Sequence, residues 1–161
     1  MKTILLLRHA KSDWGDPGLA DFDRPLAKRG LKDAPRMGRA LAQLGFVPDV
    51  ILSSTAKRAM QTAELVAEAS GFGGAIRPCP EFYGGDSHDL IAALQNLPDP
   101  VDCAMLVGHN PTMEETAAEL LCADEAVSIR MPTAALLCLE ADIDTWRDLA
   151  PGDTTLRWFL L

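Results

Sequence analysis

Short apolar runs along the chain have the length and composition of buried β-strands. They cover residues 3–7, 50–52, 104–107, 135–139 and 156–160, and the first is continuously apolar, as expected for a central strand that is buried on both faces. Apolar residues recur at helical spacing within 31–42, 59–66 and 113–121, and a further helix is expected at 87–94. Strands that alternate with helices predict an α/β fold: a three-layer sandwich with a mostly parallel central sheet and helices on both faces.

Residues at the edges of these segments predict where the helices begin and end. Gly45 and Gly71 are expected to end two of them. Pro35 lies inside the first helical pattern and predicts either a kink or a later start. Side chains able to cap the first amides of a helix precede two others, namely Ser53, Ser54 and Thr55, and then Asn110 followed by Pro111.

Length and composition narrow the class of protein. A chain of 161 residues, 48% of them hydrophobic, is expected to form a single domain over 1–161. Its formal charge of −8 argues against a nucleic-acid binder. The first apolar run is too short for a signal peptide and no segment has membrane-spanning length, which predicts a cytoplasmic protein that does not bind membranes. Four widely spaced cysteines are expected to be free thiols: Cys79, Cys103, Cys122 and Cys138.

Chemically useful side chains follow three of the predicted strands. Arg8 and His9 follow the first, Arg58 follows the second, and His109 and Asn110 follow the third. Ligand sites of open α/β sheets gather at the carboxyl ends of strands, so these residues are expected to converge. Forked guanidinium groups, an imidazole N–H and the amides that open a helix together suit a transferring phosphoryl group.

Three ordered motifs carry a resemblance to a known family. They are Leu7-Arg8-His9-Ala10-Lys11-Ser12, the segment from Ser53 through Arg58 to Thr62, and Gly108-His109-Asn110. Together they resemble the histidine phosphatase superfamily, also called phosphoglycerate mutase-like. The short length, Asp23-Arg24-Pro25-Leu26 and Arg29-Gly30 are similar to the SixA-like phosphohistidine phosphatases. The resemblance implies a phosphatase in which His9 becomes phosphorylated, Arg8, Arg58 and His109 bind the phosphoryl group, and neither a metal nor an organic cofactor takes part.

The proposed chemistry begins with in-line attack by His9 on phosphorus, and water then hydrolyses the phosphohistidine. The attacking nitrogen must be unprotonated, so the other ring nitrogen is expected to donate to a backbone carbonyl in the turn of residues 10–12. Glu81, just before Phe82-Tyr83-Gly84, matches the position of the family's acidic proton donor, with an ordinary loop carboxylate as the alternative.

Further residues are candidates for substrate contact. Lys11 and Ser12 either contact substrate or bind the backbone of their own loop, and Arg24 is expected at the rim of the pocket. Lys11 stands where mutase relatives have Glu, and Gly15 where they have a phosphate-contacting Asn, which disfavours mutase activity. Of the three tryptophans, Trp14 is the best candidate for a place near the site.

Several rival functions stay open or are disfavoured. The preferred substrate is phosphohistidine in a protein partner, and the alternatives are small phosphoesters, such as sugar or nucleotide phosphates, or a phosphate-binding module with little turnover. Asp21-Phe22-Asp23 lacks the preceding strand that an aspartate-nucleophile phosphatase requires. A metallohydrolase is disfavoured because arginines beside the site would repel the metal.

Two residues have structural alternatives to a place in the site. Arg58 could pair with Glu64 on the surface, and His88 is expected to be exposed near a helix start.

Overall fold

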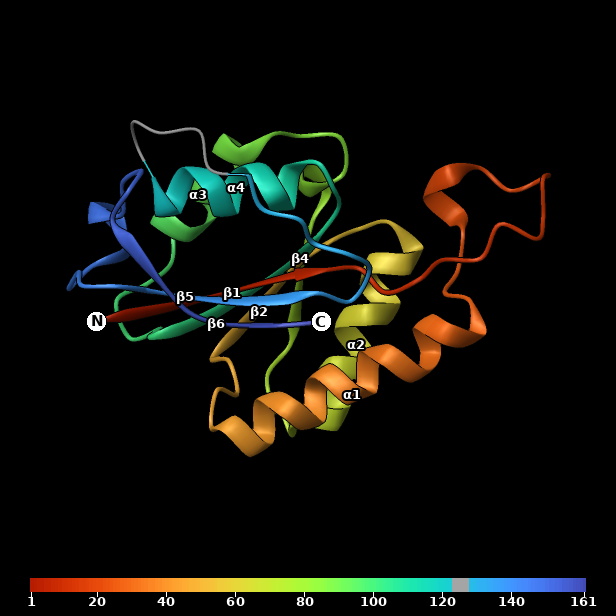
Figure 1. The fold of residues 1–161 in the computed structure, drawn as a ribbon, viewed down its shortest axis with the longest axis horizontal. Coiled ribbons are helices and arrows are strands. Elements are labelled where there is room, and N and C mark those ends of the chain that lie inside the picture. The colour runs from red at the N-terminus through yellow and green to blue at the C-terminus, as the bar shows by residue number, and fades with distance from the viewer. Residues whose placement is uncertain (123–127) are drawn as a thin grey trace.

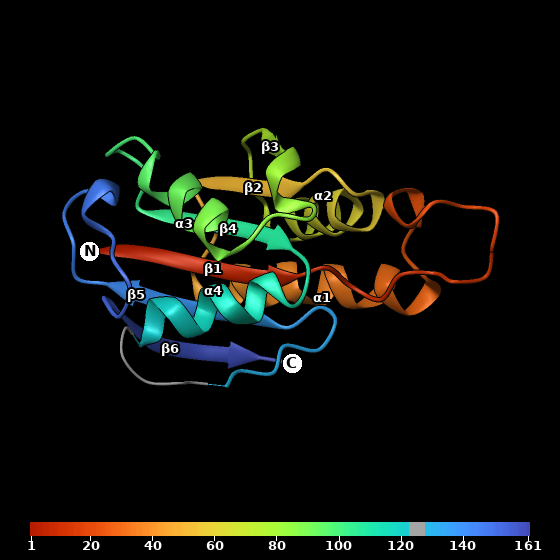
Figure 2. The ribbon, with the colours of Figure 1, turned by 90° about the horizontal axis from the view of Figure 1, so that it is seen from above.

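A six-stranded sheet runs through the middle of the molecule in the computed structural model, which describes residues 1–122 and 128–161 (Figures 1 and 2). The strand order is β3-β2-β4-β1-β5-β6. β1 pairs with β4, β4 pairs with β2, and β2 pairs with β3, all in parallel. β5 pairs antiparallel with both β1 and β6, so β5 and β6 form an antiparallel edge of the sheet. The strands are β1 (Lys2–Arg8), β2 (Val50–Ser54), β3 (Ile76–Cys79), β4 (Cys103–Gly108), β5 (Leu136–Ala141) and β6 (Thr154–Leu160).

Four helices cover the two faces of this sheet. Figure 1 shows α1 (Lys28–Leu44) and α2 (Lys57–Ser70) below the sheet, and α3 (Ser87–Gln95) and α4 (Thr112–Leu121) above it. Three short 3-10 helices lie at Asp21–Asp23, Pro80–Phe82 and Trp146–Asp148. The predicted three-layer α/β sandwich is confirmed. In the ranges 1–122 and 128–161, none of the helices combines the length and the apolar character needed to cross a membrane.

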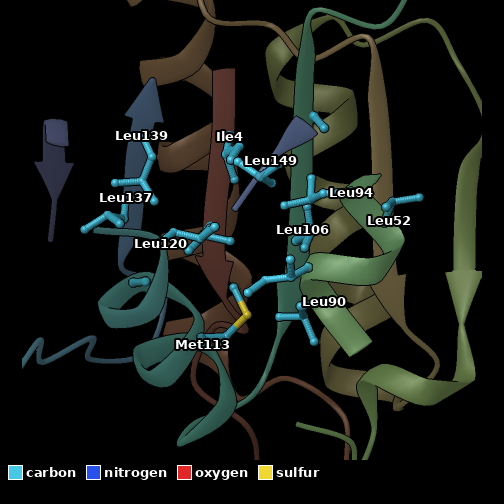
Figure 3. Close-up of a cluster of buried hydrophobic side chains, with 14 of the residues drawn as sticks. Ile4, Leu52, Leu90, Leu94, Leu106, Met113, Leu120, Leu137, Leu139 and Leu149 are labelled. Atoms are coloured by element: carbon cyan, nitrogen blue, oxygen red, sulfur yellow. The ribbon is translucent and has the colours of Figure 1, made fainter. Parts of the chain in front are cut away.

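The continuous apolar run of β1 is explained by the two cores that it separates. Ile4 and Leu6 point toward α3 and α4, where they join the cluster drawn in Figure 3. Leu5 and Leu7 point to the other face and pack in the core beneath α1 and α2. All four side chains are fully buried. Since each strand residue faces one of two helical layers, no position along the strand favours a polar side chain.

The two helix C-termini predicted from glycine residues are confirmed. Gly45 and Gly71 follow α1 and α2 with φ of 76° and 78°, the left-handed region that glycine adopts without strain. Pro35 does not delay α1, which starts at Lys28, so the prediction of a later start is wrong. Pro35 cannot donate to the carbonyl of Leu31, but Leu31 is exposed, where water can satisfy that carbonyl.

The predicted N-terminal caps are wrong. Ala56 stands at the cap position of α2 with no side-chain cap, because the hydroxyl of Ser54 is turned into the site. Pro111 stands before α4, and the Asn110 amide donates instead to the Glu114 carboxylate and to a backbone carbonyl further along the chain. The four cysteines are free thiols, as expected.

Two glycines allow backbones to approach closely on the α1 side of the molecule. A Cβ at Gly30 would lie 2.3 Å from the carbonyl oxygen of Lys11, which seats the start of α1 against the turn that follows His9. A Cβ at Gly38 would lie 2.6 Å from the carbonyl oxygen of Val66, where α1 crosses α2. Both distances are too short for a real methyl group, so neither site accepts a side chain without movement of backbone.

We expect Gly38→Ala to lower the free energy of unfolding by about 1–3 kcal/mol, because the new methyl group forces α1 away from α2. The gain in helix propensity, about 1 kcal/mol, offsets only part of this cost. Denaturant titration measures the change, with Gly73→Ala as control because nothing lies within 4 Å of its added Cβ. A Gly38→Ala variant as stable as the parent would contradict the close packing of the two helices.

Candidate active site

The two histidines meet because β1 and β4 end at the same level of the sheet. Arg8 lies opposite Gly108 in the parallel ladder, and the amide of His9 donates to the Gly108 carbonyl at 3.0 Å. The rings of His9 and His109 are 5.1 Å apart between centroids. The loop after β1 then projects beyond the carboxyl end of the sheet (Figure 2) and returns to α1. The expected convergence of strand ends is therefore present in the fold.

The buried imidazole of His9 has one nitrogen fixed and the other free of a proton. Nδ1 lies 2.8 Å from the carbonyl of Ala10, an acceptor, so Nδ1 carries the hydrogen. This is the backbone partner predicted for the turn of residues 10–12. Arg58 Nε donates to His9 Nε2 at 3.3 Å, which requires a lone pair on Nε2. Burial lowers the pKa of His9 to about 3, although the Ala10 carbonyl opposes this shift.

The second imidazole, that of His109, is oriented by a buried serine. Its Nε2 lies 2.7 Å from Ser54 Oγ, which also accepts a hydrogen bond from the Ala56 amide at 3.3 Å. His109 Nδ1 is buried and has no partner among the described residues. If the hydroxyl of Ser54 donates to Nε2, Nδ1 carries the proton and can donate it to a bound anion. Burial and the charge of Arg58 lower the pKa of His109 to about 4.

The guanidinium group of Arg58 is held by Asp21 and not by Glu64. Arg58 is 6% exposed, Nη1 donates to the Asp21 carbonyl at 2.7 Å, and Nη2 donates to its carboxylate at 3.0 Å. Arg24 also contacts the Asp21 carboxylate, through Nη2 at 2.9 Å and Nε at 3.1 Å. The hydroxyl of Tyr83 donates to it at 2.9 Å. Asp21 thus joins two arginines to a tyrosine from a distant segment.

Sequence reasoning did not find Asp21, Tyr83 or the orienting contact of Ser54. The sequence motifs place Asp21 only within a possible nucleophile motif, and Tyr83 only beside Glu81. The spacing of Asp21 and Arg24, an i,i+3 pair in a short helical turn, is the one local signal for their contact. The contact with Tyr83 spans 62 positions and has no local signal.

Arg8 and Asn110 form the other side of the site. Arg8 Nη1 donates to the carbonyl of Met131 at 2.8 Å, and the Asn110 amide donates to the same carbonyl at 3.0 Å. Glu114 accepts from both Asn110 and the Met131 amide. Arg8 Nε and Asn110 Oδ1 are buried and have no partner among the described residues. Burial lowers the pKa of Arg8, but a guanidinium group keeps its proton in proteins.

The remaining candidates lie around the rim. Arg24 is 7% exposed and its guanidinium lies 3.4 Å from the ring centroid of Trp14, which is itself exposed. Ser12 is buried in a bridge to Leu26, whereas the Lys11 side chain is exposed.

Glu81 and His88 lie on the surface, at the 3-10 helix before Tyr83 and at the start of α3. No hydrogen bond joins the Glu81 carboxylate to another residue of the described ranges, and its role as an acid stays a prediction. His88 is exposed near a helix start, as expected. Within residues 1–122 and 128–161, no group of three or more His, Cys, Asp or Glu side chains could hold a metal ion.

Both site imidazoles are expected to stay neutral in mildly acidic solution. Their lowered pKa values mean that they gain a proton only as the pH falls toward about 4 for His109 and about 3 for His9. Nitrogen-15 NMR of the ring nitrogens at pH 5.5 tests this, with His9→Gln and His109→Gln variants to assign the signals. Imidazolium signals from either ring at pH 5.5 would show that burial does not control the pKa.

We expect Ser54→Ala to release the tautomer of His109, because Nε2 then loses its hydrogen-bond partner. Ring-nitrogen NMR should show a mixture of tautomers, and the affinity for inorganic phosphate should fall roughly tenfold, the equivalent of one hydrogen bond. Ser53→Ala is the matched control, since Ser53 is equally buried but its hydroxyl donates to the Ser54 carbonyl. Equal effects of the two substitutions would refute the orienting role of Ser54.

Comparison with known proteins places this site in a family. The model of the histidine phosphatase superfamily (branch 1) matches residues 4–82. An uncharacterised chloroplast protein of Arabidopsis thaliana is 36% identical over 157 residues, which are 91% of this chain and 70% of that protein. An uncharacterised protein of Mycobacterium tuberculosis is 33% identical over 160 residues, 95% of this chain and 98% of its own length.

The fold comparison agrees with the sequence comparison. The crystal structure of SixA from Agrobacterium tumefaciens superimposes with a TM-score of 0.82 at 32% identity, and the match covers 99% of this chain and 97% of that one. The sequence motifs, the sheet order and the paired histidines at the strand ends therefore have one explanation: the chain belongs to the histidine phosphatase superfamily, within its SixA-like group.

Proposed function

We propose that this phosphatase removes the phosphoryl group from phosphohistidine in a protein partner, through a covalent phosphohistidine on His9. The observation that carries the proposal is the state of the His9 ring. Its Nδ1 is fixed by the Ala10 carbonyl, and its Nε2 presents a lone pair to Arg58 in a buried setting. A neutral imidazole with one free nitrogen is a competent nucleophile.

In the first step His9 Nε2 attacks phosphorus and a new P–N bond forms. The bond from phosphorus to the substrate imidazole breaks, its electron pair stays on that ring, and the ring leaves neutral because its other nitrogen carries a proton. The guanidinium groups of Arg8 and Arg58, together with the Nδ1 proton of His109, stabilise the equatorial oxygens. Arg58 already contacts Nε2, so its donors lie where those oxygens would come. The buried, unpartnered nitrogens of Arg8 and His109 support the same role, because a bound phosphoryl group would satisfy them.

In the second step water attacks the phosphohistidine, the P–Nε2 bond breaks, and its electron pair returns to the ring. The Ala10 carbonyl holds the hydrogen on Nδ1 throughout, so Nε2 is again free to attack when phosphate leaves. No metal enters either step of the proposal.

The chemistry of the leaving group makes phosphohistidine a better substrate than a phosphoester for a site without an acid. An alkoxide must be protonated as it leaves, whereas an imidazole depends less on an acid. Glu81, the predicted acid, makes no hydrogen bond to the other candidate site residues. Exposed rings at the mouth, those of Trp14, Phe22 and Tyr83, give a phosphorylated protein a surface to approach. The SixA relative from A. tumefaciens carries the provisional name phosphohistidine phosphatase, which supports the same substrate class.

We further propose that residues 1–161 act as one domain. The buried residues of both helical layers attach to the same sheet, and the site draws on both layers, with Arg58 from α2 and His109 from the start of α4. A stable half of the chain would therefore lack part of the site.

The covalent step is tested with a phosphohistidine-bearing protein, excess chelator and no added metal. After a rapid alkaline quench, mass spectrometry should find an acid-labile phosphate on His9, and this phosphate should be absent from His9→Gln. His88→Gln is the matched control, because the third histidine is exposed and lies outside the site. Turnover without the His9 adduct would show a different nucleophile, and loss of turnover in chelator would show that a metal is needed.

A further inference from the structure

Four atoms of three other residues contact the Asp21 carboxylate, three of them as hydrogen-bond donors and one, Arg24 Nη2, in an ion pair. Two come from Arg24, one from Arg58 and one from Tyr83, at 2.9–3.1 Å. Although burial alone would raise the pKa of Asp21, the hydrogen bonds from Tyr83 and Arg58 outweigh it and hold this pKa below its ordinary value. The carboxylate is ionised at neutral pH, as an aspartate of ordinary pKa also is, and can therefore accept a proton, while the lowered pKa makes it a weaker base.

Arg58 places this carboxylate beside the nucleophile. The Nε and Nη2 atoms lie on one edge of the planar guanidinium group. On that edge Nε contacts His9 Nε2 at 3.3 Å, and Nη2 contacts the Asp21 carboxylate at 3.0 Å. Since two acceptors on one guanidinium edge are neighbours, a phosphoryl group on Nε2 would border Asp21. The Asp21 side chain is 49% exposed, so water reaches it from the mouth of the site.

We propose that Asp21 is the general base of the hydrolytic half-reaction, a role that rests on the proposed function of His9. As the oxygen of the attacking water bonds to phosphorus, its proton passes to Asp21 and the P–Nε2 bond breaks with return of the electron pair to His9. Asp21 then gives the proton to solvent. Nothing in the sequence pattern assigns this role, and the family resemblance implies Glu81 only as the acid that protonates a leaving group.

The same ionised state limits the first half-reaction. A carboxylate without a proton cannot donate one to a leaving alkoxide, so Asp21 offers no help to a phosphoester. A leaving imidazole has less need of that help.

A positioning role is the rival explanation, because Asp21 also orders Arg58 and Arg24. The two roles differ in which step they affect. Loss of a base slows hydrolysis of the phosphoenzyme alone, whereas misplacement of Arg58 slows phosphoryl transfer in both directions and weakens binding of phosphate.

The experiment measures both steps separately in Asp21→Asn, by rapid quench and mass spectrometry of His9 during one turnover of a phosphohistidine protein. Phosphorylation of His9 should stay within about threefold of the parent rate, and hydrolysis should slow by about a hundredfold or more, the usual contribution of a general base. The phosphoenzyme should then accumulate. Asp21→Glu should recover part of the hydrolysis rate, because it keeps a carboxylate.

Asp23→Asn is the matched control, since Asp23 is exposed in the same 3-10 helix and should leave both steps unchanged. Equal slowing of both steps in Asp21→Asn, with weaker binding of inorganic phosphate, would overturn the base role in favour of positioning. Hydrolysis at the parent rate would overturn any role in this step. The absence of phosphate on His9 in the parent protein would instead overturn the proposed function, and the role of Asp21 with it.

Discussion

In the parallel ladder between β1 and β4, Arg8 lies opposite Gly108, and both strands leave the sheet at the next residue. This register places His9 and His109 side by side before any side-chain interaction is considered. A one-residue slip would turn one imidazole to the opposite face of the sheet. Along the same ladder Ile4 and Leu6 face one core, and Leu5 and Leu7 face the other.

Three arginines place positive charge beside the paired histidines. Arg8, Arg24 and Arg58 surround the site, and each is held by oxygen acceptors from elsewhere in the chain. Burial is the main reason that the pKa of His9 is low, and the charges of Arg58 and Arg8 lower it further. Two of the arginines that would bind a phosphoryl group in the proposed function therefore also help to keep the His9 ring neutral.

The sequence predicts the layers of the fold because apolar periodicity reports burial, and burial organises β1, β2, β4 and the helices. It does not predict β3, where Ile76-Arg77-Pro78-Cys79 has neither a long apolar run nor an alternating one and becomes a strand by pairing with β2. The two wrong helix caps, Ser54 and Asn110, have a common cause. Both residues have the local chemistry of a cap, but their side chains make contacts at the active site, which a local pattern cannot reveal.

The site residues also divide into those that the sequence predicts and those that it does not. Arg8, His9, Arg58 and His109 follow strands or open helices, so topology alone brings them together. Asp21 and Tyr83 lie in segments whose course depends on tertiary contacts, and their hydrogen bond joins positions 62 residues apart. Sequence reasoning therefore found the two histidines and the two arginines that the fold brings together, and it missed the carboxylate beside them.

The lowered pKa values of the two histidines have a consequence for regulation by acidity. The guanidinium groups keep their protons at any physiological pH, and the imidazoles stay neutral down to about pH 4. The charge on these side chains is therefore the same in mildly acidic and in mildly alkaline solution. On the proposed function, a change of activity with pH in this range would have to come from other groups, such as those of the substrate.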